Sequence, residues 1–312
     1  MEKALKESDF VDLYLGNDYA EIKGLVGDNV FLQPVPDVLS TDVFALKEKC
    51  LAFYHDSKRT EYSLRYDSRL YRVTVARDFP GDIELVIRQT PSEIKPFDSV
   101  PFTSDIRTSI EQKHASGLIL ISGNMASGKT TTAASVLSHR ISITGNLGVA
   151  IEDPAETPLH GRHGKGRCIQ LEVKEDQGYA SALKKAYRTG ATSFLLGEIR
   201  DGATAHEVLK ASLSMFVVAT IHAPTVFDAL ERYVMFCEEH SSNAKAIIAN
   251  TLYILAHQKM TFSINNRRMI DISAYNLKHA TIASTIKARI SGGNYSLEEQ
   301  FKNLKYIFED GR

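Results

Sequence analysis

Short apolar runs that alternate with polar residues fill the first hundred positions of the chain. The clearest alternation spans residues 71–76 and 83–88, and a period of two residues is typical of a β-strand with one buried face. The polar side of these two strands includes Arg72 and Arg88. The pattern predicts a small α/β domain, with further strands at residues 12–15, 20–23 and 30–33 and a helix that Ser40 or Thr41 caps.

A proline-punctuated stretch, TPSEIKPFDSVPF, follows this region and shows little periodicity. Such a composition is typical of a linker, so we expect two domains, residues 1–97 and 98–312. Beyond the linker, wholly apolar runs alternate with helical patterns, which predicts a parallel sheet with helices on its faces and active residues at the carboxyl ends of the strands. The expected strands are 118–121, 148–152, 194–197 and 216–221, and the expected helices are 131–137, 179–189, 204–212 and 225–236.

The last seventy residues predict a helix followed by a hairpin and two more helices. The helix is expected from Ala244 to His257, and the hairpin pairs residues 260–263 with 269–275 through Asn265-Asn266. The closing helices are expected at 281–290 and 297–307.

The first buried run leads into a glycine-rich segment. Gly123, Gly128, Lys129 and Thr130 fit the pattern G-x-x-x-x-G-K-[ST], in which backbone N–H groups surround phosphate oxygens, the lysine reaches the outer phosphates and the threonine hydroxyl binds Mg²⁺. A helix after the loop would direct the positive end of its dipole at the phosphates. The segment therefore predicts a nucleotide-binding loop, and the alternative is a glycine-rich turn that fits the pattern by chance.

Three carboxylates, Glu152, Asp153 and Glu156, follow the second buried run. Acids this close repel one another unless a cation is near, and a Mg·nucleotide on the glycine loop would supply one. One carboxylate would then orient or deprotonate the attacking water. The alternative is an exposed acidic turn that caps a helix.

The third buried run ends at Glu198, and Gly197 stands where P-loop enzymes usually carry an aspartate. A glutamate at this place can still hold Mg²⁺ through water, because the ion keeps much of its hydration shell. For Arg200 and Asp201 the alternative is an ordinary ion pair at a helix start. The fourth run delivers His222 to the same predicted edge, where it would sense the terminal phosphate, although a lone histidine is more often structural.

Composition narrows the remaining classes of function. Among 312 residues, 43% are hydrophobic and 24% charged, and the net charge of -1 gives no whole-chain attraction to nucleic acid. Three separated cysteines are too few for a disulfide framework or a four-thiolate zinc site. With neither a signal peptide nor a membrane-spanning run expected, we expect a cytoplasmic protein that a partner holds at the membrane.

Four segments in order, GNMASGKTT, IEDPAE, LLGEIRD and ATIH, resemble the motifs of the secretion superfamily ATPases. These are the hexameric motors of type II secretion, type IV pili and type IV secretion. DLYL, YRVTV and VIRQTPS resemble the PAS-like N-terminal domain of the pilus retraction motors in that family. The resemblance implies a RecA-like P-loop ATPase domain with a parallel sheet and a helical C-terminal tail, preceded by a PAS-like α/β domain.

The resemblance also implies cofactors, partners and residue roles. The cofactors would be ATP and Mg²⁺, and the partners other copies in a hexameric ring and an inner-membrane platform protein, with no direct nucleic-acid contact. Glu156 would be the general base, Glu198 would order Mg²⁺ and water, His222 would sense the γ-phosphate, Glu152 would support the metal shell, and Thr130 and Glu198 would serve the metal. The implied nucleotide-binding residues are Gly123, Ala126, Ser127, Gly128, Lys129, Thr130, Thr131, Arg72 and Arg88.

Some features differ from the family pattern. Residues 212–215 replace a threonine-glycine-histidine run, residues 188–191 replace an arginine-x-aspartate-proline pattern, and the A-I-R segment of retraction motors is not recognisable around 281–288. The four-cysteine zinc motif and extra N-terminal domains of extension and secretion motors are also absent, which favours a short retraction motor. The alternatives are a conjugative or type IV secretion ATPase, and a nucleotide-binding assembly or regulatory module with negligible hydrolysis.

One basic segment, HGRHGKGR at residues 160–167, fits none of these motifs. Its composition predicts a mobile surface loop. The alternative is a contact with an anionic partner or with a neighbouring subunit of the ring.

Overall fold

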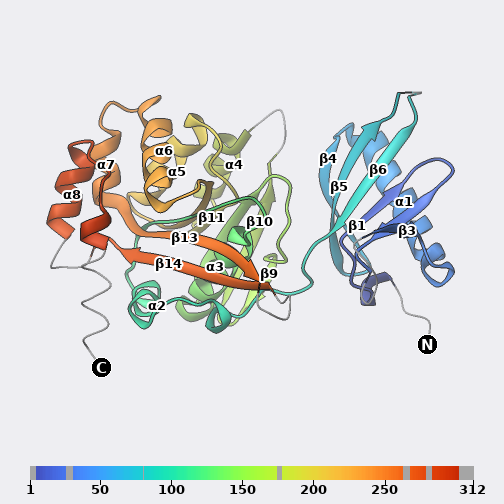
Figure 1. The fold of residues 1–312 in the computed structure, drawn as a ribbon, viewed down its shortest axis with the longest axis horizontal. Coiled ribbons are helices and arrows are strands. Elements are labelled where there is room, and N and C mark those ends of the chain that lie inside the picture. Colours follow the sequence, from blue (N-terminus) through green and yellow to red (C-terminus); the bar gives the residue numbers. More distant parts are fainter. Residues whose placement is uncertain are drawn as a thin grey trace. The chain divides into compact units, whose positions relative to one another are not determined.

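The computed structural model describes residues 5–25, 31–79, 81–173, 178–262, 268–278 and 283–301. The chain divides into two units, each built around its own sheet (Figure 1). One unit comprises Met1–Glu93 together with Asp153–Pro158, and the other comprises Ile94–Glu152 together with Leu159–Arg312.

The N-terminal unit is a six-stranded antiparallel sheet with one long helix. The strand order is β3-β2-β1-β6-β5-β4. The strands are β1 (Asp12–Leu15), β2 (Ala20–Lys23), β3 (Leu32–Pro34), β4 (Glu61–Tyr66), β5 (Arg69–Arg77) and β6 (Ile83–Gln89), with a short 3₁₀ turn η1 (Leu5–Glu7) before them and helix α1 (Asp37–Ser57) between β3 and β4. The predicted strands 12–15, 20–23, 71–76 and 83–88 are confirmed, whereas the strand predicted at 30–33 is observed at Leu32–Pro34, with Val30 outside the described residues, and β4 was not predicted.

Helix α1 begins earlier than the predicted start at Thr41. Pro36 precedes its first turn with φ −58°, and its carbonyl accepts the backbone N–H of Leu39 at 2.9 Å. The fixed φ of proline suits the start of a helix, whereas Ser40 donates its hydroxyl back to the Pro36 carbonyl instead of capping. Four residues of α1 enter the core shared with the sheet: Leu39, Val43, Leu46 and Cys50.

Arg72 and Arg88 lie directly opposite one another in the β5–β6 ladder. Like charges in such a pair destabilise a sheet, and nearby carboxylates offset the repulsion. Arg88 bonds Asp12 through Nε–Oδ1 at 2.8 Å and Nη2–Oδ2 at 3.2 Å, which raises the pKa of Arg88. Arg72 lies 3.7 Å from Glu61 and 3.8 Å from Glu156, measured between guanidinium nitrogen and carboxylate oxygen.

The second unit contains an eight-stranded sheet in the order β14-β13-β7-β12-β11-β8-β10-β9. The six central strands from β13 to β10 are parallel, and β14 and β9 pair antiparallel at the two edges. The predicted parallel sheet is therefore confirmed for the centre. The strands are β7 (Gly117–Gly123), β8 (Leu147–Glu152), β9 (Gly161–His163), β10 (Gly166–Glu172), β11 (Ser193–Leu196), β12 (Phe216–His222), β13 (Leu252–Phe262) and β14 (Arg268–Asn276).

Helices cover both faces of this sheet (Figure 1). Strand β7 shows the reason: Ile119 and Ile121 enter the core with α2 and α3, while Leu118 and Leu120 enter the core with the other helices. Each such side chain stabilises the fold by about 1.5–3 kcal/mol, so β7 is held firmly from both sides. A 3₁₀ turn η2 (Phe97–Ser99), α2 (Ser104–Glu111) and α3 (Lys129–Thr144) lie on one face, and α4 (Gly178–Tyr187), α5 (Gly202–Ser212), α6 (Val226–Glu238), α7 (Ala244–Thr251) and α8 (Ala283–Ser291) on the other.

The predicted helix from Ala244 to His257 is wrong in its second half. Helix α7 ends at Thr251, and β13 begins at Leu252 and runs parallel to β7. Residues 252–256 are all buried, so they lack the alternation that distinguishes a strand from a helix. Strand β10 was likewise not predicted. Residues 302–307 of the predicted last helix lie outside the described residues.

The three cysteines, Cys50, Cys168 and Cys237, are all buried. Burial raises the pKa of each thiol to about 12. Within the ranges given above, no helix combines the length and the apolar composition needed to cross a bilayer.

Candidate functional site

The glycine loop connects β7 to α3, as the sequence predicts. Gly128 caps α3 in the left-handed region with φ +86°, no side chain bonds the cap, and no acidic residue occupies the first turn. The first N–H groups of a helix lack partners within it, and they attract anions. Ala126 also has a positive φ of 58°, which is uncommon for a residue with a Cβ and typical of functional loops.

Lys129, the first residue of α3, folds its side chain back over the loop. Only 6% of the residue is exposed, and its ammonium donates to the carbonyls of Gly123 at 3.0 Å and Asn124 at 2.8 Å. A third contact joins Nζ to His222 Nδ1 at 3.1 Å. The ammonium of Lys129 is thus held against the glycine loop. A bound phosphate would take the place of the two carbonyls and the imidazole nitrogen as its acceptors.

His222 connects this lysine to an acid that follows the neighbouring strand. It is the last residue of β12 and lies beside Gly123 in the β7–β12 ladder. Its Nε2 is 3.1 Å from Glu198 Oε1, and Glu198 follows β11, the neighbour of β12. The structure therefore brings Lys129, His222 and Glu198 together at the carboxyl edge of three adjacent strands.

Arg200 and Asp201 have separate roles. Arg200 Nε bonds Glu198 Oε2 at 2.8 Å, whereas Asp201 is the N-cap of α5 and accepts the backbone N–H of Thr204 at 2.7 Å. Arg200 and Asp201 therefore do not form the ion pair that the alternative predicted: Arg200 pairs with Glu198, and Asp201 caps α5.

Glu152 ends β8, the next strand along the same edge, and is 1% exposed. Gln170 donates its side-chain amide to Glu152 Oε2. Gly197 lies close by, and a Cβ on it would meet the Cα of Glu152 at an ordinary 3.5 Å. There is thus room for a Cβ at position 197, so steric crowding does not explain why glycine replaces the usual aspartate.

The other predicted site residues belong to different places. Glu156 lies in Asp153–Pro158, within the N-terminal unit, as do Arg72 and Arg88. Ser127 is buried in the loop, and Thr130 and Thr131 are half-buried in the first turn of α3.

Three residues near the loop were missed from the sequence. Arg232 of α6 donates to the His222 carbonyl at 2.9 Å. His257 of β13 contacts Ser122 through Nδ1 and Oγ at 2.9 Å, and the following residue, Gln258, donates to the Ser127 carbonyl at 2.5 Å. The last two lie on β13, whose residues 252–257 were predicted as the end of a helix.

The basic segment 160–167 forms a β-hairpin from β9 and β10, so the predicted loop is wrong. Gly161 to His163 pair with Gly166 to Cys168. His163 holds the hairpin against α3, because Nδ1 lies 2.8 Å from Ser138 Oγ and Nε2 lies 2.7 Å from the Leu159 carbonyl.

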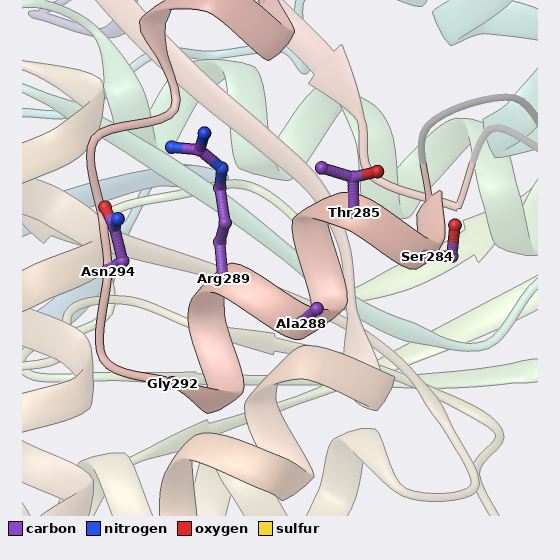
Figure 2. Close-up of a pocket in the computed structure, with 6 residues that line it drawn as sticks. All are labelled: Ser284, Thr285, Ala288, Arg289, Gly292 and Asn294. Carbon is purple, nitrogen blue, oxygen red and sulfur yellow. The ribbon is translucent and has the colours of Figure 1, made fainter.

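A shallow surface pocket of about 480 Å³ lies on α8 and the segment after it (Figure 2). It contains none of the predicted site residues, and no contact among the described residues indicates a ligand for it. Its lining residues are Ser284, Thr285, Ala288, Arg289, Gly292 and Asn294.

The residues at the sheet edge suit a magnesium nucleotide. An uncapped helix start and the ammonium of Lys129 complement phosphate charge. The hydroxyl of Thr130 and the carboxylate of Glu198 are the hard oxygen donors that Mg²⁺ prefers.

Comparison with known proteins gives a consistent result. Residues 84–299 match the family described as Type II/IV secretion system protein. The type II secretion system protein HxcR of Pseudomonas aeruginosa is 36% identical over 126 residues, which cover 40% of this chain and 25% of HxcR. The competence protein ComGA of Streptococcus pneumoniae is 33% identical over 175 residues, 54% of this chain and 52% of ComGA. The type IV pilus retraction ATPase PilT of Pseudomonas aeruginosa is 29% identical over 208 residues, 62% of this chain and 59% of PilT.

The chain thus spans between a quarter and about three fifths of the length of these relatives. Among solved structures, the pilus retraction motor PilT with bound ADP aligns with a TM-score of 0.74 at 21% identity, over 96% of this chain and 84% of PilT. The ATPase DotB of Legionella pneumophila aligns with a TM-score of 0.71 at 18% identity, over 93% and 84%. At this identity the likeness is one of fold, and it confirms the predicted α/β fold class.

Proposed function

We propose that this chain, which belongs to the type II/IV secretion system protein family, binds and hydrolyses Mg·ATP as a motor. The observation that supports hydrolysis best is the contact chain from Lys129 through His222 to Glu198. It connects the lysine that would bind phosphate to a carboxylate of the kind that would hold the metal of a Mg·nucleotide.

Each residue at the edge then has a proposed task. Lys129 and the N–H groups at the start of α3 bind the phosphates, and Thr130 and Glu198 hold Mg²⁺, which would neutralise charge on the phosphates. His222 senses the terminal phosphate, and Glu152 supports the metal shell. Glu156 accepts the proton of the attacking water.

The N-terminal unit supplies two more proposed nucleotide ligands, Arg72 and Arg88. Both would stabilise charge on the transferred phosphoryl group. Each is occupied by carboxylates in this structure, so nucleotide binding would require them to exchange partners.

We further propose that six copies form a ring at the cytoplasmic side of an inner membrane, on a platform protein, and retract a type IV pilus. The alignment with PilT supports this role, because it covers more of this chain than the other two relatives described above. Direct contact with nucleic acid is not part of the proposal.

A second role is in competence, since the identity with ComGA is higher than the identity with PilT. Export by a conjugative or type IV secretion system, and nucleotide binding with negligible hydrolysis, remain the other candidates. These roles differ in the machine that the protein would drive. Retraction, competence and export would all use the same ATP hydrolysis at this site, whereas the binding module would not hydrolyse ATP at a significant rate.

Purified protein tests the chemistry. We expect phosphate release from ATP that requires Mg²⁺ and stops when the metal is chelated. Lys129→Ala should abolish nucleotide binding, whereas Glu156→Gln should preserve binding and lower turnover by about 10²-fold or more. Nucleotide binding by the wild type without phosphate release would instead support the regulatory module.

Deletion of the gene tests the machine. If the protein retracts a pilus, the deletion strain should keep its surface pili but lose twitching motility. If it serves competence, the strain should no longer take up added DNA. If it serves export, the strain should lose transfer of DNA or protein to a recipient cell but keep its pili and DNA uptake.

A further inference from the structure

Gln258 occupies the space directly behind the glycine loop. It lies on β13, one residue beyond the last pairing of that strand with β7, in which His257 is opposite Ser122. Its exposed fraction is 0%, and a buried amide is costly unless it is hydrogen-bonded. Nε2 donates to the Ser127 carbonyl at 2.5 Å, and Oε1 has no partner in the described part of the chain.

Both glycines of the motif face this one residue. A Cβ on Gly123 would lie 2.3 Å from the Gln258 backbone carbonyl, and a Cβ on Gly128 would lie 2.9 Å from Gln258 Nε2. Both contacts are shorter than real Cβ atoms allow, and both glycines have positive φ. The loop is therefore folded tightly around Gln258.

The bond to Ser127 sets the direction of the next peptide group. In a trans peptide the C=O of one residue and the N–H of the following residue point in opposite directions. Because the Ser127 carbonyl points inward to Gln258, the N–H of Gly128 points outward, toward the side where phosphate oxygens bind in such loops.

We propose that Gln258 is a positioning residue of the phosphate loop, which holds the Ser127–Gly128 peptide in the orientation that binds nucleotide. The inference rests on the proposed function, since it requires that the loop bind phosphate. Gln258 acts through the loop and does not touch the nucleotide.

Gln258→Glu tests this directly, because glutamic acid has the shape of glutamine. The neutral acid can donate its O–H to the Ser127 carbonyl, whereas the carboxylate cannot donate and repels it. Burial raises the pKa of a carboxyl group, so both forms are accessible near neutrality. We expect the Kd for a fluorescent ADP analogue to rise by about tenfold or more between mildly acidic and mildly alkaline pH, relative to the wild type over the same range.

Two further variants complete the test. Gln258→Met keeps the side-chain volume but has no hydrogen-bond donor, so its affinity for the ADP analogue should be reduced by a similar factor at every pH. If the glutamate variant unfolds at alkaline pH, the methionine variant alone tests the positioning role. Gln300→Glu is the matched control, since Gln300 is also buried at 8% exposure and its Oε1 also lacks a partner among the described residues. Its Kd should follow that of the wild type.

The outcomes separate the two proposals. A folded Gln258→Met protein with wild-type affinity, or a Gln258→Glu protein whose pH dependence equals that of Gln300→Glu, overturns the positioning role. A wild-type protein that binds no nucleotide overturns the proposed function instead.

Discussion

His222, the last residue of β12, and Glu198, which follows the neighbouring β11, lie with Nε2 and Oε1 3.1 Å apart. The opposite ring nitrogen, Nδ1, faces the ammonium of Lys129 at 3.1 Å. An ammonium only donates, so Nδ1 accepts and the proton of the neutral ring lies on Nε2, directed at Glu198. The contacts with Lys129 and Glu198 therefore favour the Nε2–H tautomer of His222.

The first prediction concerns this ring. His222→Ala should lower the ATP turnover number by about 10²-fold, while the Kd for ADP changes only a few-fold, because Lys129 keeps its contacts with the carbonyls of Gly123 and Asn124. His222→Asn can offer an acceptor to Lys129 but does not reach Glu198, so it should be as slow as the alanine variant. Turnover near the wild-type value in the asparagine variant would show that the contact with Glu198 is dispensable.

A second prediction separates the helix cap from an ion pair at Asp201. Asp201→Ala should reduce the free energy of unfolding by about 1 kcal/mol, because the N–H of Thr204 loses its acceptor. Asp201→Asn retains a cap acceptor and should lose only a few tenths. Equal losses in the two variants, measured by urea denaturation, would mean that the charge and not the cap stabilises this end of α5.

Arg140 supports a third prediction. The residue is 4% exposed, and its guanidinium donates to carbonyls at and after the end of α2: those of Ile110, Gln112, Lys113 and Ala115. Arg140→Met leaves buried acceptors unpaired and should lower the free energy of unfolding by about 3 kcal/mol.

Arg107 is the matched comparison for Arg140. It also donates to several backbone carbonyls, but 24% of its side chain is exposed, so water can replace part of what is lost. Arg107→Met should therefore cost clearly less than Arg140→Met in the same denaturation experiment. An equal or larger cost at Arg107 contradicts the argument from burial.

The fourth prediction is a pH dependence of stability through His257. Burial, followed by the charges of Lys259 and Lys129, lowers the pKa of His257 from its usual 6.5. Below 6.5 the unfolded chain binds a proton that the folded chain does not bind until a lower pH. This contribution to stability is therefore complete above 6.5 and is lost as the pH falls from 6.5 to the folded-state pKa.

His257→Asn can keep a polar contact with Ser122 but does not titrate. Its free energy of unfolding should fall less steeply than that of the wild type as the pH is lowered below 6.5. Parallel curves for the two proteins would show that His257 has the same pKa in the folded and unfolded chain.

Much of the candidate site follows from the order of elements along the chain. Glu198 and His222 come directly after or at the end of a buried run, and Lys129 follows another such run through the glycine loop. Parallel strands with helical crossovers bring such ends to one edge of a sheet. Local patterns were sufficient for this step, because each run was bounded by a glycine or by a polar residue that ended the strand.

The contribution of β13 could not be read in the same way. Residues 252–256 are buried on both faces of the sheet, and an apolar run without alternation continues the pattern of the helix before it. The available signal was the polar pair His257-Gln258 directly after this run, which repeats the arrangement that ends β12 at His222. Contacts between Gln258 and the loop depend on long-range pairing, so no local pattern contains them.

The burial of all three thiols has a practical consequence for following the motion of the proposed motor. A thiol with a pKa of about 12 is almost entirely protonated at neutral pH and reacts slowly with maleimides. Cysteines introduced at the exposed positions Phe79 and Met235, one in each unit, would thus take up a donor and an acceptor dye without removal of any native cysteine. Energy transfer between the dyes would report the separation of the two units at each stage of nucleotide turnover.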